Sequence, residues 1–273
     1  MAGSRSSRDA DRPVSIQTGV GHAQVVPDPS RSEAATLFID GFVHGHVDAS
    51  DMSRLKLDYQ ARLTTIILAL LPDRPARVAH LGGGAFAIPR AVAAARPDVT
   101  QTVFERSAAI IKLARRHLGL RPDDRLVVRK GDGRAGLARI PDGALELVVG
   151  DAFVNQDTPR HMTTVEFMAE IKRVLAPGGC YVVNIIDAQP WSKLGVQTAA
   201  ASAVFADVAA AGSRGVARLR DPGNVFLIGA VERVPRATLQ AAGAGARHPL
   251  ALMADGRLVA LGRTQRLRHD TDG

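Results

Sequence analysis

The sequence predicts an α/β fold in which a mostly parallel sheet is covered by helices on both faces and preceded by a small β-unit. From residue 77 onward, short apolar runs typical of strands alternate with longer segments typical of helices. The strand-like runs are apolar throughout, as expected for strands that are buried on both faces. The chain of 273 residues is 46% hydrophobic, which suffices for one large domain with a small appendage. Repeated strand–helix alternation of this kind indicates a parallel sheet.

The charge and cysteine content argue against several kinds of partner. The net charge is +8, but the 30 Arg and five Lys are scattered through every segment, so we expect no nucleic-acid partner. The single cysteine, Cys180, excludes an internal disulfide and a Cys-cluster metal site. His44 and His46 lie close together without a third ligand nearby, so we expect no metal.

The apolar runs predict a chain without a membrane partner. The longest strongly apolar run covers residues 63–71, which is too short to cross a membrane. The N-terminal arginines are not followed by an apolar signal core. We therefore expect a cytoplasmic protein.

The first 54 residues form two segments of different character. Residues 1–13 are polar and charged without periodicity, which predicts a disordered tail. Residues 14–54 contain short strand-like runs bounded by Gly, Pro or Asp, which predict an N-terminal β-hairpin unit. The pair Asp40-Gly41 separates two of these runs and is typical of a two-residue hairpin turn.

Residues 55–233 are predicted to form the main domain. Apolar residues recur at helical spacing over 55–71, and a helix at 164–175 is preceded by Thr163 and Glu166 at the spacing of a capping box. Seven strands are predicted, at 77–81, 100–104, 125–129, 145–149, 181–186, 215–219 and 224–231. The other helices are predicted at 88–95, 107–118, 133–138 and 191–211.

Residues 234–273 are predicted to form a C-terminal extension. Two short apolar runs, at 250–253 and 258–261, flank the turn-forming pair Asp255-Gly256. This arrangement predicts one further hairpin, which a basic polar tail follows.

The turn after the first predicted strand of the main domain is made of three glycines, Gly82, Gly83 and Gly84. A turn without side chains lets backbone amides approach a ligand closely at the start of the next helix. Pro89 lies in the first turn of that helix, where its missing N–H costs nothing. A tight strand–helix connection in any α/β protein has the same pattern, so these glycines alone favour a nucleotide-like ligand only modestly.

Acidic residues follow the next three predicted strands. Glu105 lies 21 residues after Gly84, the spacing at which a carboxylate accepts hydrogen bonds from ribose hydroxyls. Asp132 lies between two glycines, where it is placed to hold an adenine amino group, and Asp151 follows the fourth strand. Each acid alone could be a helix cap. Together they favour an uncharged or cationic adenosyl ligand, such as S-adenosylmethionine, over a phosphate-rich dinucleotide.

These residues resemble the polyamine aminopropyltransferases, the spermidine synthase family, within the Rossmann-like methyltransferase fold. The resemblance extends from Leu37 to Ala230. It implies a mostly parallel seven-stranded sheet with helices on both faces and a small N-terminal β-unit, as a catalytic domain and its appendage. It also implies a homodimer. The matching residues are the segments 37–41, 59–60, 81–84 and 131–133, with Glu105 and the Asp151 loop.

The resemblance implies a ligand and a role for each matching residue. Decarboxylated S-adenosylmethionine, or S-adenosylmethionine, would be the co-substrate, without a metal, and a small-molecule amine would be the acceptor. Asp151 would take a proton from the attacking amine, and Tyr59 would help to position that amine. The co-substrate would be bound by Gly82, Gly83 and Gly84 along the turn, by Glu105 at the ribose, by Asp132 and Gly133 at the adenine, and by Gln24 from the N-terminal strands.

The chain departs from the family at two positions. Ala85 and Val154 stand where aminopropyltransferases usually carry acids that meet the two amines. Asp157 or Asp187 could substitute for them. Three hypotheses therefore stay open: an aminopropyltransferase-like enzyme with altered amine specificity, a methyltransferase that uses intact S-adenosylmethionine, and a non-catalytic homologue that binds an adenosyl ligand or a partner chain.

Overall fold

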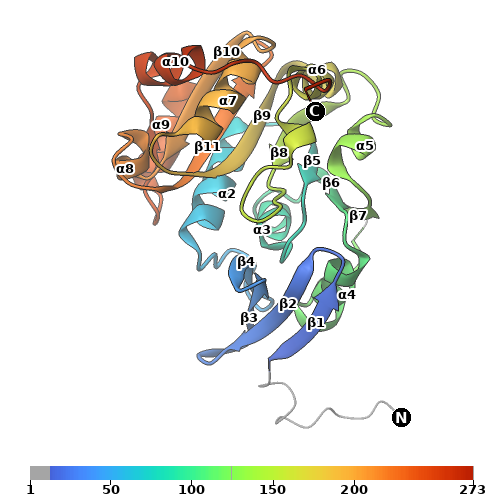
Figure 1. Ribbon diagram of the computed structural model, residues 1–273. Coiled ribbons are helices and arrows are strands. Elements are labelled where there is room, and N and C mark those ends of the chain that lie inside the picture. The colour runs from blue at the N-terminus through green and yellow to red at the C-terminus, as the bar shows by residue number, and fades with distance from the viewer. Residues whose placement is uncertain (1–12, 124, 273) are drawn as a thin grey trace, which may run out of the picture.

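The computed structural model describes residues 13–123 and 125–272 (Figure 1). The disordered tail expected at residues 1–13 therefore lies outside the described residues, apart from Pro13. Among the described helices, none has both the length and the apolar character needed to cross a membrane.

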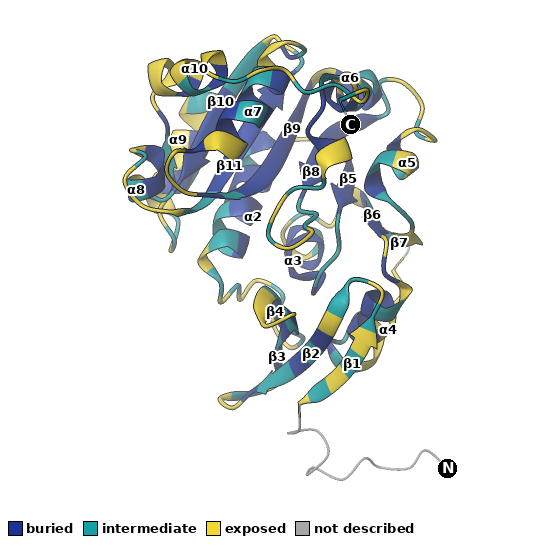
Figure 2. Ribbon diagram, viewed as in Figure 1, coloured by how far each residue is buried: buried dark blue, intermediate teal, exposed yellow. Residues whose placement is uncertain are grey.

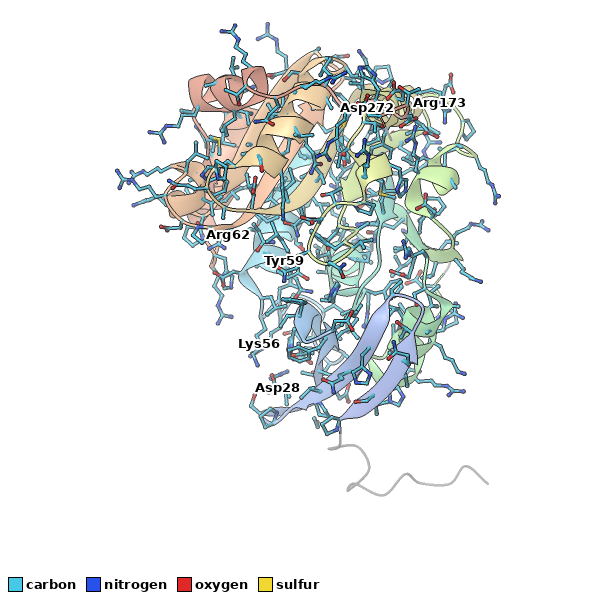
Figure 3. The ribbon with its side chains drawn as sticks, viewed as in Figure 1. Asp28, Lys56, Tyr59, Arg62, Arg173 and Asp272 are labelled. Atoms are coloured by element: carbon cyan, nitrogen blue, oxygen red, sulfur yellow. The ribbon has the colours of Figure 1, made fainter. Side chains whose placement is uncertain are left out.

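The N-terminal unit is a four-stranded antiparallel sheet whose strands follow one another in sequence order (Figure 1). Asp40 and Gly41 both have positive φ, 49° and 81°, and form the predicted turn between the last two strands. Lys56 Nζ donates to Asp28 Oδ2 at 2.7 Å and joins this sheet to the segment that leads to the main domain (Figure 3). The strands are β1 (Val14–Thr18), β2 (Gly21–Asp28), β3 (Arg31–Ile39) and β4 (Phe42–Asp48).

The main sheet has eight strands in the order β12-β10-β11-β9-β8-β5-β6-β7. Five neighbouring strands, from β9 to β7, are parallel, and β9 pairs with β11, β11 with β10 and β10 with β12 in antiparallel fashion. The predicted mostly parallel sheet is confirmed: six of the seven expected strands are present, and β10 and the two-residue edge strand β12 were not predicted as part of it. The strands are β5 (Arg77–Leu81), β6 (Thr100–Glu105), β7 (Leu126–Lys130), β8 (Leu145–Gly150), β9 (Leu175–Asp187), β10 (Asp207–Gly212), β11 (Gly223–Ala230) and β12 (Ala251–Leu252).

Helices pack on both faces of this sheet, as predicted (Figure 1). One apolar core lies between the sheet and α2, α3 and α9, and a second lies between the sheet and α5, α6, α7 and α10. A third core joins the N-terminal sheet to α4 and the start of α3, and Figure 2 shows how fully the central strands are buried. The helices are α2 (Asp58–Leu70), α3 (Ala87–Ala95), α4 (Ala108–His117), α5 (Gly133–Leu137), the 3₁₀ helix η1 (Arg160–Met162), α6 (Val165–Val174), α7 (Ser192–Ser202), α8 (Arg214–Ala217), α9 (Arg236–Gly245) and α10 (Asp255–Arg263).

Two predictions between residues 191 and 219 are wrong. The helix predicted at 191–211 ends at Ser202, and the alanines that follow, at 209–211, are buried in β10. Alanine favours a helix in isolation, but burial inside a sheet overrides that preference. The strand predicted at 215–219 is instead the short helix α8, whose first turn is capped by the Ser213 hydroxyl.

The hairpin predicted in the C-terminal extension is also wrong. Asp255-Gly256 does not form a turn but begins α10, and α9 was not predicted. Only the first of the two apolar runs pairs with the sheet, through Ala251 and Leu252 of β12. In the second run Leu258 is buried and Val259 is exposed, which suits either a helix or a strand when the run is this short.

The capping box predicted before α6 is corrected in its details. Thr164, not Thr163, caps the helix by accepting a hydrogen bond from the Phe167 amide at 3.2 Å. The Glu166 carboxylate accepts instead from His269 Nδ1 at 2.8 Å and from the Asp270 amide at 3.1 Å. A contact from the far end of the chain has replaced the local one.

Candidate active site

A cavity of about 710 Å³ lies at the carboxyl ends of the parallel strands, where the sheet order reverses between β5 and β8. This is the position at which open α/β sheets bind ligands. Residues from the β3–β4 turn, the start of α2 and the loop after β8 complete the wall. Tyr59, labelled in Figure 3, lies where the main sheet faces the N-terminal unit. The cavity is thus shared between the two sheets.

The glycine turn after β5 has no space for side chains. Gly82 has a φ of 103°, and a Cβ on it would lie 2.4 Å from the backbone oxygen of Asp151. Gly84 has a φ of 50°, and a Cβ there would lie 2.9 Å from the backbone oxygen of His44. Both glycines line the cavity. The turn is therefore packed between the β8 loop and β4, with its backbone available to a ligand.

Glu105 lies at the end of β6 and supports the glycine turn. Its Oε2 accepts hydrogen bonds from the amides of Gly83 at 3.0 Å and Gly84 at 3.4 Å, and its Oε1 accepts from the Ser107 amide at 2.8 Å. The side chain is buried and lines the cavity. Glu105, which is predicted to bind the ribose, thus lies beside the glycines and also stabilises their loop.

Asp132 begins α5 on the same side of the cavity. Its Oδ1 caps the helix by accepting from the Ala135 amide at 3.1 Å, and its Oδ2 lies 3.0 Å from His161 Nε2. A Cβ on the next residue, Gly133, would lie 3.0 Å from Leu81 Cβ. Asp132 and Gly133 line the cavity together with residues of the glycine turn, as predicted, and His161 is a partner that the sequence did not indicate.

Asp151 follows β8 and is held by Asn184, which is held in turn by Asn224. Asn184 Nδ2 donates to Asp151 Oδ1 at 2.9 Å, and Asn224 Nδ2 donates to Asn184 Oδ1 at 3.0 Å. Burial raises the pKa of Asp151 to about 6, and the hydrogen bond from Asn184 limits this rise. All three side chains line the cavity. The carboxylate is thus oriented through one oxygen and titrates close to neutral pH.

Tyr59 and His44 approach this carboxylate from α2 and β4. The Tyr59 hydroxyl donates to the backbone oxygen of His44 at 3.4 Å. Burial, with the negative charge of Asp151 as the next cause, raises the pKa of Tyr59, so it remains a hydroxyl donor. Burial also lowers the pKa of His44, whose ring is therefore neutral at physiological pH.

Gln24 is not brought to the cavity. It lies on β2 and its amide donates to Ser15 Oγ at 3.3 Å, away from the residues that line the cavity. Within the described residues, no three His, Cys, Asp or Glu side chains are grouped so that they could hold a metal ion.

The two candidate substitutes for the missing acids are engaged elsewhere. Asp157 is exposed and pairs with Lys193. Asp187 accepts from the amides of Ala188 at 2.9 Å and Leu194 at 2.8 Å. Neither lines the cavity. Asp157 and Asp187 therefore do not replace the acids that the resemblance implies at positions 85 and 154.

Ala85 itself lies outside the cavity wall. Its side chain is 2% exposed, and a Cβ added to Gly45 of β4 would lie 2.7 Å from Ala85 Cβ and 3.0 Å from Gln60 Nε2. The residue after the glycine turn therefore packs against the N-terminal sheet.

Comparisons with known proteins agree with this architecture. No protein-family model matches the chain. A polyamine aminopropyltransferase from Vibrio vulnificus is 27% identical over 122 residues, which are 44% of this chain and 41% of that protein. The match thus spans less than half of the length of that curated relative.

Solved structures match over more of the chain. A probable spermidine synthase from Corynebacterium glutamicum has a TM-score of 0.86 and 23% identity, and the match covers 95% of this chain and 97% of that one. The spermidine synthase from Thermotoga maritima has a TM-score of 0.63 and 17% identity over 90% and 82% of the two chains. Human methyltransferase-like protein 13 has a TM-score of 0.54 and 18% identity over 79% and 97%. The predicted Rossmann-like methyltransferase fold and the resemblance to spermidine synthases are confirmed.

Proposed function

We propose that this protein is a spermidine synthase-like transferase that moves an aminopropyl group from decarboxylated S-adenosylmethionine to a small amine. The observation that carries the proposal is Asp151, a half-buried carboxylate in the cavity with a pKa raised to about 6. Its backbone packs on Gly82, so it stands beside the turn along which the co-substrate would lie. The likeness to an aminopropyltransferase and to spermidine synthases supports the same activity.

The adenosyl part of the co-substrate fits the wall formed by β5, β6 and β7. Gly82, Gly83 and Gly84 would follow its chain, Glu105 would accept from the ribose hydroxyls, and Asp132 with Gly133 would hold the adenine. One spermidine synthase of this fold was solved with the transition state analogue AdoDATO, and human methyltransferase-like protein 13 was solved with SAH. These complexes support a related ligand here.

The transfer step needs alignment and one proton acceptor. The amine nitrogen attacks the propyl carbon bound to sulfur, the carbon–sulfur bond breaks, and its electron pair goes to sulfur. The sulfonium becomes the neutral thioether methylthioadenosine. Asp151 accepts the proton that the amine nitrogen loses, since its carboxylate is ionised above pH 6. Tyr59 positions the amine by accepting from its N–H through the phenolic oxygen, because the Tyr59 O–H donates to the backbone oxygen of His44.

A second candidate is methyl transfer from intact S-adenosylmethionine. It is favoured by Ala85, which packs against β4 and places no carboxylate near the ligand's amino-acid end. A propylamine cation without such a partner is held weakly, whereas the carboxylate of intact S-adenosylmethionine meets no like charge at that position. Both reactions use the same in-line geometry and differ in which carbon on sulfur reacts.

Calorimetry with three ligands separates these functions. We expect methylthioadenosine and decarboxylated S-adenosylmethionine to bind, the latter at least about tenfold more tightly than S-adenosylmethionine. Asp132→Ala should weaken the binding of all three, whereas Asp142→Ala, which removes an exposed acid outside the cavity, should not. Preference for S-adenosylmethionine would favour methyl transfer. If none of the three ligands bound, both activities would be excluded.

A further inference from the structure

We infer that the acceptor is a primary amine with one cationic nitrogen and an apolar body, and not a diamine. This inference rests on the proposed transfer function and concerns the part of the cavity around Asp151 and Tyr59. Three features carry it: an exposed apolar rim, apolar side chains beside the proton acceptor, and the exposure of the other carboxylates nearby.

The first feature is a rim of exposed apolar side chains, formed by Phe42, Val43 and Val154. Their exposed fractions are 50%, 45% and 43%. In the described part of the chain, five large apolar side chains are exposed, and these three all line the cavity. Apolar groups gathered at one site in this way indicate contact with an apolar ligand.

The second feature is the apolar wall next to Asp151. Leu57 lies two residues before Tyr59, and Val43 lies directly before His44. Both therefore belong to the two segments that the Tyr59–His44 hydrogen bond joins, and both line the cavity. Ile186 lies two residues after Asn184 on β9, on the same face of the strand, and lines the cavity as well. An amine held at Asp151 therefore places its hydrocarbon part against these side chains.

The third feature is the charge around this wall. Besides Asp151, the acids from the β3–β4 turn and α2 that line the cavity are Asp40 and Asp58. Asp40 is exposed and accepts from the His22 amide at 2.7 Å. Asp58 is exposed and already paired with Arg62 at 3.2 Å and with His248 at 2.9 Å (Figure 3 labels Arg62).

Of these three described acids, Asp151 is thus the one that is half-buried, whereas water screens the exposed carboxylates of Asp40 and Asp58. His44 adds no negative charge because its ring is neutral. The second ammonium of a diamine would gain only a screened attraction to these exposed carboxylates and would bury no apolar surface on the rim. An apolar body of the same length would instead gain free energy from burying its methylene groups there.

The test compares pentylamine with putrescine, which have the same number of non-hydrogen atoms and differ in one end group. Binding of each amine is measured by calorimetry with the protein saturated by methylthioadenosine. We expect pentylamine to bind about tenfold more tightly than putrescine, since its methyl end buries apolar surface against the rim and the second ammonium of putrescine does not.

A pair of matched variants locates the effect. Val154→Asp places a carboxylate on the rim and should improve putrescine relative to pentylamine by about tenfold. Val259→Asp changes a valine of similar exposure, 48%, on α10 and outside the cavity, and should leave the preference unchanged. Both positions are exposed, so neither change disturbs an apolar core.

If pentylamine is preferred but Val154→Asp leaves that preference unchanged, the rim does not determine it, and the inference is overturned. If methylthioadenosine does not bind, the proposed transfer function fails, whatever the amines do. If methylthioadenosine binds but putrescine binds as tightly as pentylamine, or neither amine binds, the inference alone is overturned. If Val154→Asp alters the sedimentation of the protein and leaves the amine preference unchanged, the rim is an interface between copies of the chain, which also overturns the inference.

Discussion

The carboxylate of Asp151 is oriented by two asparagine side chains that are hydrogen-bonded in series. Asn224 holds Asn184, and Asn184 holds one oxygen of Asp151, while the other oxygen accepts no hydrogen bond from the described residues and remains available to a substrate. The pKa of about 6 follows from burial that a single donor only partly offsets. At the residue scale this is the feature on which the proposed chemistry depends.

Removing the first amide should change the pH dependence of the reaction. In Asn184→Leu the donor that limits the pKa of Asp151 is lost, so this pKa should rise above about 6. The acid limb of the kcat/KM profile should then move to higher pH. Asn224→Ala should have a smaller effect in the same direction, because it acts through Asn184. An unchanged acid limb in Asn184→Leu would mean that another group titrates.

The raised pKa of Asp151 also has a consequence for stability. Its pKa rises from 3.8 to about 6 on folding, so the ionised form is disfavoured in the folded state above pH 6, and this penalty disappears below pH 4. Asp151→Asn should therefore stabilise the protein by about 2 kcal/mol at pH 8 and by little at pH 4. Urea denaturation at the two pH values measures this difference, and equal effects at both would contradict the assigned burial.

The acidic residues of the site could be predicted from the sequence, and the two asparagines could not. Glu105, Asp132 and Asp151 each follow a predicted strand, and the parallel topology requires such positions to meet at one edge. Asn184 and Asn224 interrupt apolar strands, which is a weak signal of a polar site. Sequence periodicity does not say whether such a residue faces a cavity or a neighbouring strand.

At the scale of elements, the connection from β5 to α3 determines the shape of the site. The glycines and Pro89 made this strand–turn–helix unit predictable, because each residue has a local conformational reason to be there. The Ala-rich segment after residue 191 has no such local signal, and burial alone decides that 207–212 form β10. Residue types therefore predicted the local structure only where glycine and proline constrain the backbone.

The packing of this turn on β4 predicts the result of restoring a family acid. Ala85→Asp would place a carboxylate against Gly45, at a position where Ala85 is 2% exposed. We expect a loss of roughly 3 kcal/mol in the free energy of unfolding and no gain in amine binding. Thermal unfolding checks the first part and calorimetry the second. Val154→Asp is the control, since its exposed side chain should leave stability nearly unchanged.

At the scale of the whole molecule, residues near the C-terminus contact α5, the helix that Asp132 begins. Figure 1 shows the C-terminal segment crossing from α10 to α6, and Asp272 lies at that end in Figure 3. Asp270 accepts from both Nη atoms of Arg134, at 2.8 and 2.6 Å, and Arg134 also donates to the His161 backbone oxygen at 2.7 Å. No local pattern predicts a contact between residues so distant in sequence.

This contact should influence ligand binding from a distance. Asp270→Asn would remove the charge that pairs with Arg134 on α5, the helix that Asp132 begins. We expect a loss of about 1 kcal/mol in stability and a few-fold weaker binding of methylthioadenosine. Asp142→Asn, which removes the exposed partner of Arg173, should change neither quantity appreciably (Figure 3 labels Arg173). Equal effects of the two variants would show that the tail does not support the cavity.

The most direct test of the proposed function is the release of methylthioadenosine from decarboxylated S-adenosylmethionine in the presence of pentylamine or putrescine. The wild-type protein should release one methylthioadenosine for each amine that is alkylated. Asp151→Asn should bind methylthioadenosine with unchanged affinity and release product at least about 100-fold more slowly. Turnover by Asp151→Asn at the wild-type rate, or no release by the wild type with either amine, would contradict the proposal.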